Sequence, residues 1–253
     1  MNTFTKAKFF VAGVLCHPLV GRTLCLIFRR KIPGGGFRAD VRNPSVSLAN
    51  VAKIFWRIYE KPEASFVRRY LDPNLDVIEL GSSLGIISLN IMGVQHPDRQ
   101  LVCVEANPHL IRTINDNIRL NWPQRKVKVL NRAVDYSGRT HIEFLVDEGN
   151  LGSHIIEGSS DSTVAILTTT LSALLEEHNM KKFALVTDIE GAEVGLLLED
   201  SAALANCCQI IIELHPTRYG EESYDVSRLK EIIESVHGFN LVNRRNDVLF
   251  FSK

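Results

Sequence analysis

The sequence has 253 residues, of which 45% are hydrophobic and 23% charged, a size and composition that suit one α/β domain with its own core. This apolar content excludes a disordered chain, and 16 Gly with 9 Pro exclude a collagen-like one. Lys plus Arg and Asp plus Glu each number 29, and a net charge of zero argues against a nucleic-acid partner. Five scattered cysteines without a C-x-x-C spacing favour a reducing, cytoplasmic location.

The N-terminal part contains one long apolar segment, residues 9–28. Three basic residues follow it: Arg29, Arg30 and Lys31. Arg22 and a His-Pro pair interrupt the segment, and both are unfavourable at bilayer depth. We therefore favour helices that pack on the domain over a membrane-spanning or secretory segment. An interfacial anchor, with peripheral membrane contact through residues 9–31, remains the second interpretation.

A change of pattern divides the chain near residue 74. A Pro-Gly-Gly-Gly breaker at residues 33–36 ends the first segment, and residues 48–71 then carry apolar positions at helical spacing. We expect residues 1–73 to form a helical lead-in, which could associate with a membrane, and residues 74–253 to form the main domain.

From residue 74 onward, strand-like and helix-like runs alternate, which predicts a doubly wound, mostly parallel α/β sheet of seven strands. The expected strands are 77–80, 101–105, 127–130, 183–187, 210–214, 240–243 and 248–251. The expected helices lie near 84–94, 108–121, 171–178, 192–203 and 226–237. The last two strands are joined by a short polar turn and should form an antiparallel hairpin. Residues 149–162 are rich in Gly and Ser, and fit equally well a solvated loop and a flap over a site.

A glycine-containing turn closes the first strand, with the sequence Glu-Leu-Gly-Ser-Ser-Leu-Gly at residues 79–85. Gly81 allows the sharp turn, Ser83 stands where a third glycine could be, and Gly85 admits a close helix. Glu105 ends the next strand, where a carboxylate can accept two hydrogen bonds from a ribose diol. The alternative is a simple turn glycine beside an exposed strand-end Glu.

Four further motifs follow in chain order. They are Glu-Ala-Asn-Pro at 105–108, Asn-Arg-Ala-Val at 131–134, Asp-Ile-Glu-Gly-Ala-Glu at 188–193 and Glu-Leu-His-Pro at 213–216. This order resembles the FkbM family of S-adenosylmethionine-dependent methyltransferases over roughly residues 74–252, and the box at 188–193 is the most specific element. The resemblance implies a class I methyltransferase fold, which is Rossmann-like, and S-adenosylmethionine as cofactor.

The resemblance also implies cofactor contacts at nine positions. These are Glu79, Gly81, Ser83, Gly85, Glu105, Ala106, Asn107, Ala133 and Asp135. Glu105 would hold the ribose hydroxyls, whereas Ala133 and Asp135 would approach the adenine. Ser83 replaces the Asn of many family members, which removes one polar side-chain contact to the cofactor.

Methyl transfer to a hydroxyl needs help with the departing proton, from a base or a metal. The catalytic candidates are Asp188, Glu213 and His215, because they end the fourth and fifth strands, where such sheets place ligands. The alternative for the box is structural: Asp188 would cap the following helix and Glu193 would lie at the surface. We assign no residue as a metal ligand; a divalent metal held by Asp188 and Glu213, with or without His215, is compatible with the oxygen ligands but not demanded by their spacing.

The sequence therefore favours an S-adenosylmethionine-dependent O-methyltransferase. The resemblance implies a hydroxyl on a sugar, glycan or secondary-metabolite acceptor, so the expected partner is a small molecule or glycan. Two alternatives stay open: a catalytically silent cofactor-fold module held at a membrane or glycan-assembly complex, and a nicotinamide-dependent oxidoreductase. The missing G-x-G-x-x-G and the terminal hairpin disfavour the last.

Overall fold

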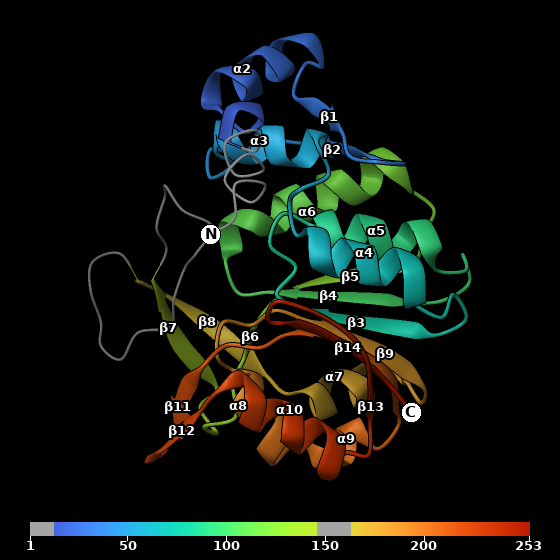
Figure 1. The fold of residues 1–253 in the computed structure, drawn as a ribbon, viewed down its shortest axis with the longest axis vertical. Coiled ribbons are helices and arrows are strands. Elements are labelled where there is room, and N and C mark those ends of the chain that lie inside the picture. Colours follow the sequence, from blue (N-terminus) through green and yellow to red (C-terminus); the bar gives the residue numbers. More distant parts are fainter. Residues whose placement is uncertain (1–12, 146–162) are drawn as a thin grey trace, which may run out of the picture.

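A computed structural model describes residues 13–145 and 163–253, and its centre is a seven-stranded sheet (Figure 1). In spatial order its strands are β13 (Asn240–Arg245), β14 (Val248–Ser252), β10 (Cys207–Glu213), β9 (Phe183–Thr187), β3 (Asp76–Leu80), β4 (Leu101–Glu105) and β5 (Val127–Asn131). The five strands from β10 to β5 are parallel, whereas β14 runs antiparallel to both of its neighbours. The doubly wound, mostly parallel, methyltransferase-like sheet with its terminal hairpin is confirmed.

Helices cover both faces of this sheet, so the central strands are apolar on both sides. On one face lie α4 (Lys61–Tyr70), α5 (Ile86–Val94) and α6 (Pro108–Asn121). On the other lie α7 (Leu171–Glu177), α8 (Glu193–Glu199), α9 (Ser201–Leu204) and α10 (Val226–Ser235) (Figure 1). Successive residues of β3 alternate between the two layers: Val77 joins the core under α4–α6, and Ile78 joins the opposite core.

Two expected helices are broken in the structure. The run 48–71 forms α3 (Leu48–Phe55) and α4, because Arg57 and Glu60 adopt left-handed backbone angles between them. The run 192–203 divides into α8 and α9 at Asp200, whose carboxylate accepts from Ser172 and Tyr136 instead. Apolar spacing continues across both breaks, which is why periodicity alone did not locate them.

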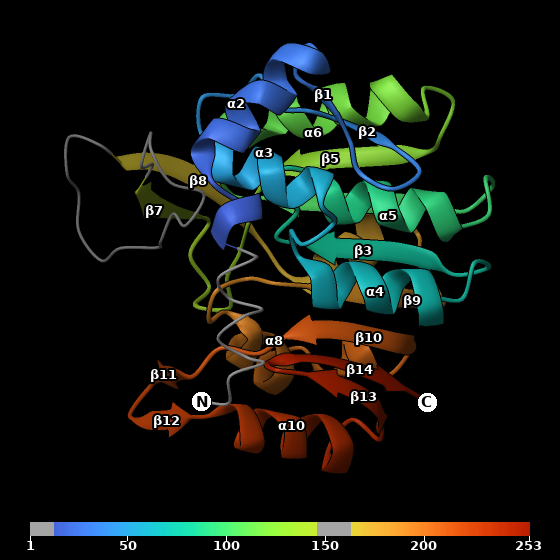
Figure 2. The same ribbon diagram turned by 45° about the horizontal axis from the view of Figure 1, so that its top comes forward.

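The N-terminal part packs on the α6 side of the sheet and contains a hairpin that we did not predict. Helix α2 (Pro18–Ile27) lies on α3, and β1 (Lys31–Pro33) pairs with β2 (Arg38–Asp40) (Figure 2). Asn117 of α6 accepts a hydrogen bond from the Asp40 amide at 2.6 Å. One apolar cluster includes side chains from both sides of residue 74, so packing is continuous across the expected domain boundary.

Two small sheets flank the carboxyl ends of the central strands. One joins β6 (Ala133–Val134), β8 (Thr163–Thr169) and β7 (His141–Leu145), and the other pairs β11 (Thr217–Tyr219) with β12 (Glu222–Tyr224). The proposed flap at 149–162 and the start of the apolar segment at 9–12 lie outside the described residues. Within the described residues, no helix has the length and apolar character needed to span a bilayer.

Candidate functional site

The glycine turn after β3 is locked against the loop after β9. Gly81 has a φ of +83°, and a Cβ at this position would lie 1.8 Å from the carbonyl oxygen of Asp188. The Asp188 amide also donates to the Leu80 carbonyl at 3.0 Å. Only glycine combines this backbone angle with so close an approach. The predicted cofactor turn and the predicted catalytic residue are thus in direct contact.

Glu105 ties together the turns after β3 and β4. Its two carboxylate oxygens accept the amides of Ser83 and Asn107, each at 2.7 Å. The side chain is buried, and burial raises its pKa above the usual range. An ionised carboxylate offers about four acceptor positions, so these two amides leave capacity for a ligand hydroxyl. The Tyr59 hydroxyl lies 3.4 Å from the Ser83 hydroxyl, which links the lead-in to the same turn.

Glu79 is a buried carboxyl group with one oxygen left over. Its Oε2 accepts from Ser88 and Cys103, whereas Oε1 has no hydrogen-bond partner among the described residues. The Glu79 residue is 2% exposed, and burial raises its pKa to about 7. A buried acceptor without a partner is costly unless a ligand completes it.

Five carboxyl groups gather around the carboxyl ends of β3, β9 and β10. They are Glu60, Glu63, Glu79, Asp188 and Glu213. All but Glu213 line a cavity of about 10 Å³, which has room for one water-sized group. In the part of the chain that the structure describes, none of the five forms an ion pair with Lys or Arg.

Burial and mutual repulsion raise the pKa of these groups. The pKa of Glu60 and that of Glu63 lie well above the usual range, mainly through burial. Burial, together with repulsion from Glu213, raises the pKa of Asp188 to about 7. The hydroxyl of Thr187, 1% exposed, lines the same cavity and also lacks a partner among the described side chains and backbone. The site is therefore polar and acidic, and some of its buried oxygen atoms have no hydrogen-bond partner among the described residues.

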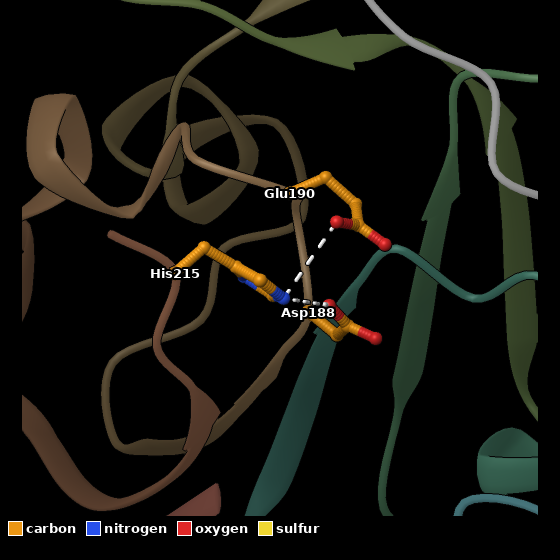
Figure 3. A group of neighbouring side chains, drawn as sticks. All are labelled: Asp188, Glu190 and His215. Atoms are coloured by element: carbon orange, nitrogen blue, oxygen red, sulfur yellow. Dashed lines mark ion pairs between the residues drawn. The ribbon is translucent and has the colours of Figure 1, made fainter. Parts of the chain in front are cut away.

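His215 lies beside this cluster and brings three acidic side chains together. Its Nδ1 is 3.0 Å from Oε1 of Glu193, and its Nε2 is 3.8 Å from Asp188 and 3.6 Å from Glu190. Figure 3 shows Asp188 and Glu190 on the same side of the imidazole ring. The hydrogen bond to Glu193 raises the pKa of His215 to about 9, so the ring is cationic at neutral pH.

Glu193 contradicts the structural alternative for the box. Its side chain is 0% exposed rather than at the surface, and it accepts the amides of Ile189 and Gly191 as well as His215. Ala192, not Asp188, is the N-cap of α8. Asp188 is therefore free of a capping role and points toward His215 (Figure 3).

Two sets of three side chains have the closeness of a cation site. Oxygen atoms of Glu63, Asp188 and Glu213 lie within 4.8 Å of one another, as do ligating atoms of Asp188, Glu190 and His215. Hard cations favour such oxygen sets, and a cation held by His215 would have to displace the ring proton that Glu193 stabilises. The arrangement of these side chains therefore allows a divalent cation but does not require one.

Not every residue that we predicted to contact the cofactor lies in the carboxylate cluster. Ala106 and Ala133 pack in a small apolar cluster near β6–β8, and Asp135 accepts from Ser137 and lies 3.4 Å from Arg139. Within the residues described, no interaction connects Ala133 or Asp135 to the carboxylate cluster. Their approach to adenine stays a prediction.

A wider hollow of about 540 Å³ begins next to His215 and runs along β11 and β12. Its lining is Pro216, Thr217, Arg218, Ser223, Tyr224, Asp225 and Arg228. Arg228 covers the Tyr224 ring at 4.1 Å, so a guanidinium and an aromatic ring lie together in the lining. The lining thus mixes apolar surface with hydroxyl, carboxylate and guanidinium groups, and the hollow has room for a small molecule.

Sequence reasoning missed the roles of Glu60, Glu63 and Glu193. Glu60 is the N-cap of α4 and Glu63 lies in its first turn. Both belong to the run 48–71 that we expected to be helical, and we did not place them at the site. Their spacing of three residues gave no signal, because Glu60 has a left-handed backbone and lies outside the helix. Glu193 offered no signal either, because an acid in the first turn of a helix is usually exposed to solvent.

The sequence pattern of the methyltransferase FkbM domain matches residues 90–241, more than half of the chain. The chain belongs to this family. The match includes Glu105, the Asp188–Glu193 box and His215, whereas the glycine turn at 79–85 precedes it. No curated protein matches the sequence.

Solved structures resemble the chain only distantly. A candidate tRNA (m1A22) methyltransferase from Streptococcus pneumoniae, in complex with S-adenosyl-L-methionine, is 12% identical over 76% of this chain and 72% of its own, with a TM-score of 0.46. A Streptococcus agalactiae protein of the NADB-Rossmann superfamily is 12% identical over 75% and 67%, with a TM-score of 0.44. A precorrin-6y C5,15-methyltransferase from Geobacter metallireducens is 11% identical over 77% and 89%, with a TM-score of 0.41.

Proposed function

We propose that this FkbM-family protein uses S-adenosylmethionine to methylate a hydroxyl group of a sugar, glycan or secondary-metabolite acceptor. The observation that carries the proposal is the cluster of five carboxyl groups at the ligand end of the sheet, with no Lys or Arg paired to them among the described residues. Such a cluster complements a ligand that brings positive charge.

The residues present fit this cofactor. Its ammonium and sulfonium groups carry positive charge, whereas Glu63, Glu79 and Asp188 have no Lys or Arg partner among the described residues. The cavity that these three side chains line suits one group of ammonium size. The unpartnered oxygens of Glu79 and Thr187 are two acceptors for that group. A dinucleotide would instead bring a pyrophosphate, which the same carboxylates repel, so the nicotinamide alternative fits less well.

The remaining cofactor contacts follow from the two turns. Glu105 is held by the backbone amides of Ser83 and Asn107 and keeps acceptor capacity for the ribose hydroxyls. Gly81 and Gly85 let this turn pack closely against Asp188 and Ile114, which fixes the main chain at the proposed cofactor position. Both turns are fixed before any ligand arrives, which lowers the entropic cost of binding.

S-adenosylmethionine supplies an electrophilic methyl group on a sulfonium. Asp188 is the base in this proposal, since a pKa of about 7 lets it accept a proton from the acceptor hydroxyl at neutral pH. His215, kept cationic by Glu193, lies 3.8 Å from Asp188 and favours its ionised form. The hollow that starts at Pro216 would hold the acceptor, and its mixed apolar and polar lining suits a ring that carries hydroxyl groups.

Cofactor binding is tested first, by calorimetric titration of the full chain with S-adenosylmethionine and with S-adenosylhomocysteine. We expect both to bind, and we expect the Glu79→Gln variant to lose affinity for both, because they share the ammonium group. The Glu231→Gln variant, which changes an exposed residue on α10, is the matched control. A folded protein that binds neither ligand would leave the silent-module alternative as the better description.

The acceptor class is tested with cofactor that carries a labelled methyl group. The full chain is incubated with panels of sugars, oligosaccharides and phenolic or polyketide alcohols, and the products are separated by mass. A methyl ether survives mild alkali and hydroxylamine, whereas a methyl ester does not. Label found only in esters or amines would overturn the hydroxyl acceptor while leaving the methyltransferase activity intact.

A further inference from the structure

Helix α2 presents an apolar face to solvent. Leu19, Leu26 and Ile27 are 64%, 75% and 65% exposed. Of the eleven exposed large apolar side chains among the described residues, six lie between residues 14 and 56. Exposed apolar side chains scattered singly are ordinary, but a contiguous set on one element marks an interaction surface.

The packing of α2 fixes which side faces outward. Gly21 lies against α3 so closely that a Cβ there would be 1.8 Å from the Leu48 carbonyl oxygen. Leu24 and Cys25 are buried on the same side. At 100° per residue, Leu19 and Leu26 project on the opposite side of the helix. Figures 1 and 2 show α2 at the outer edge of the molecule, beyond α3 and remote from α10.

Charge is divided unevenly between this end and the rest of the chain. Residues 1–39 contain seven of the 29 Lys and Arg residues and none of the 29 Asp and Glu residues. Residues 40–253 therefore carry an excess of acidic side chains, although the net charge is zero. Arg22 lies on α2 itself, and Arg29, Arg30 and Lys31, all exposed, follow directly. At helical spacing Arg22 lies between Leu19 and Leu26 on the outer side of α2, and the three further basic residues follow at the end of the helix.

We propose that the outer face of α2, with Leu19, Leu26 and Ile27 and the basic residues at its border, binds the surface of an anionic lipid bilayer. The apolar side chains enter the headgroup region and the basic ones contact lipid phosphates. The acidic remainder of the protein is repelled, which orients the molecule. A second copy of the chain is a poorer occupant, because two identical basic borders would repel each other.

The test is co-flotation of the full chain with vesicles. One set contains phosphatidylglycerol and phosphatidylcholine in equal amounts, and the other contains phosphatidylcholine alone. We expect binding to the anionic vesicles only, and we expect it to weaken as salt rises from about 0.1 M to about 1 M, where the Debye length falls from about 10 Å to about 3 Å. Equal binding to both vesicle types, or to neither, overturns the proposal.

Two pairs of variants separate the apolar and the electrostatic contributions. Leu26→Ser with Ile27→Ser, and Arg22→Gln with Lys31→Gln, should each lower affinity for the anionic vesicles by about tenfold or more. The matched controls are Val236→Ser with Val242→Ser, and Lys181→Gln with Lys182→Gln, which change exposed residues elsewhere and should leave binding unchanged.

Equal losses in the control variants would show non-specific binding and overturn the assignment of this face. So would sedimentation that shows a dimer dispersed by the Leu26 and Ile27 changes, which would assign the face to a second copy. Affinity for S-adenosylmethionine, measured on the same proteins, should not change in any variant. The experiments can therefore overturn the proposed membrane binding without affecting the proposed methyl transfer, and the reverse.

Discussion

The buried carboxylate of Glu193 lies 3.0 Å from Nδ1 of His215, and it also accepts two amides of the turn that carries Asp188. One side chain therefore positions both partners of the proposed proton-handling pair. In this arrangement Glu193 acts through His215 and Asp188, so it is a positioning residue.

Replacing Glu193 by Gln should lower the pKa of His215 from about 9, because the main cause of its elevation is removed. We expect turnover to fall while cofactor affinity stays within about threefold. NMR titration of the His215 ring measures the first effect directly. The control is Glu199→Gln, an exposed position on α8. An unchanged His215 pKa in a folded variant would show that Glu193 only supports the turn.

The pH profile should be bell-shaped. Asp188 must be ionised to accept a proton, so kcat/KM for the cofactor should rise as the pH passes about 7. His215 should remain cationic, so the rate should fall above about 9. These limbs belong to the coupled pair rather than to either residue alone. A single rising limb near 9 would instead identify His215 as the base.

Asp188→Asn keeps the shape of the side chain but removes its charge. Turnover should fall by roughly 10²-fold or more with little change in cofactor affinity. Asp98→Asn, at an exposed loop position, is the control. Loss of wild-type activity in chelator, restored by a divalent ion, would transfer the role to a metal held by Asp188 and its acidic neighbours. Normal turnover in the Asn variant would remove Asp188 from the chemistry.

Substitution of Glu105 separates ligand binding from loop support. Glu105→Ala should weaken cofactor binding about tenfold or more, since charge-assisted hydrogen bonds contribute about 1.5–3 kcal/mol each. It should also lower the melting temperature, because the Ser83 and Asn107 amides lose their acceptor. A homologous ligand without the ribose hydroxyls should bind wild type and variant alike. Equal weakening for that ligand would mean that Glu105 acts through the loop alone.

Without ligand, the protein should become less stable as the pH rises from about 5 to about 9. Glu79 and Asp188 each have a pKa near 7 in the folded state, above the usual values of 4.5 and 3.8, and His215 is raised from 6.5 to about 9. The folded state then binds more protons than the unfolded state in this window, so the free energy of unfolding falls with rising pH. Denaturant unfolding at several pH values measures the slope.

The same linkage gives a sharper test with Glu79→Gln. At pH 8 the free energy of unfolding of the variant should exceed that of wild type by on the order of 3 kcal/mol, because the variant has no buried group to ionise. At pH 5 the two proteins should have more nearly equal stability. The cofactor affinity of the variant should fall at both pH values. A variant that is less stable than wild type at pH 8 would show that the Glu79 carboxylate is satisfied by a partner.

The sequence predicted the parallel strands closely because each is a short apolar run buried on both faces, as in Leu101–Glu105. The glycine turn and the strand-end acids were also predictable, since their spacing follows from the fold. The burial of Glu193 and the approach of Glu63 were not, because both depend on how a helix packs rather than on its own sequence. The break at Glu60 was hidden for a related reason: a left-handed residue interrupts a helix without changing its apolar spacing.

The contact between Gly81 and the Asp188 carbonyl has a consequence for how acceptor preference can change. In the proposed function, the cofactor turn and the proposed base Asp188 share one wall of main chain, so folding sets the separation between the bound methyl donor and the proton acceptor. Neither loop can be lengthened or rotated alone without forcing the other to move. The hollow along β11 and β12 is lined by residues other than Gly81 and Asp188. We therefore expect changes of acceptor preference to begin at these lining residues, because they leave the contact between Gly81 and Asp188 unchanged.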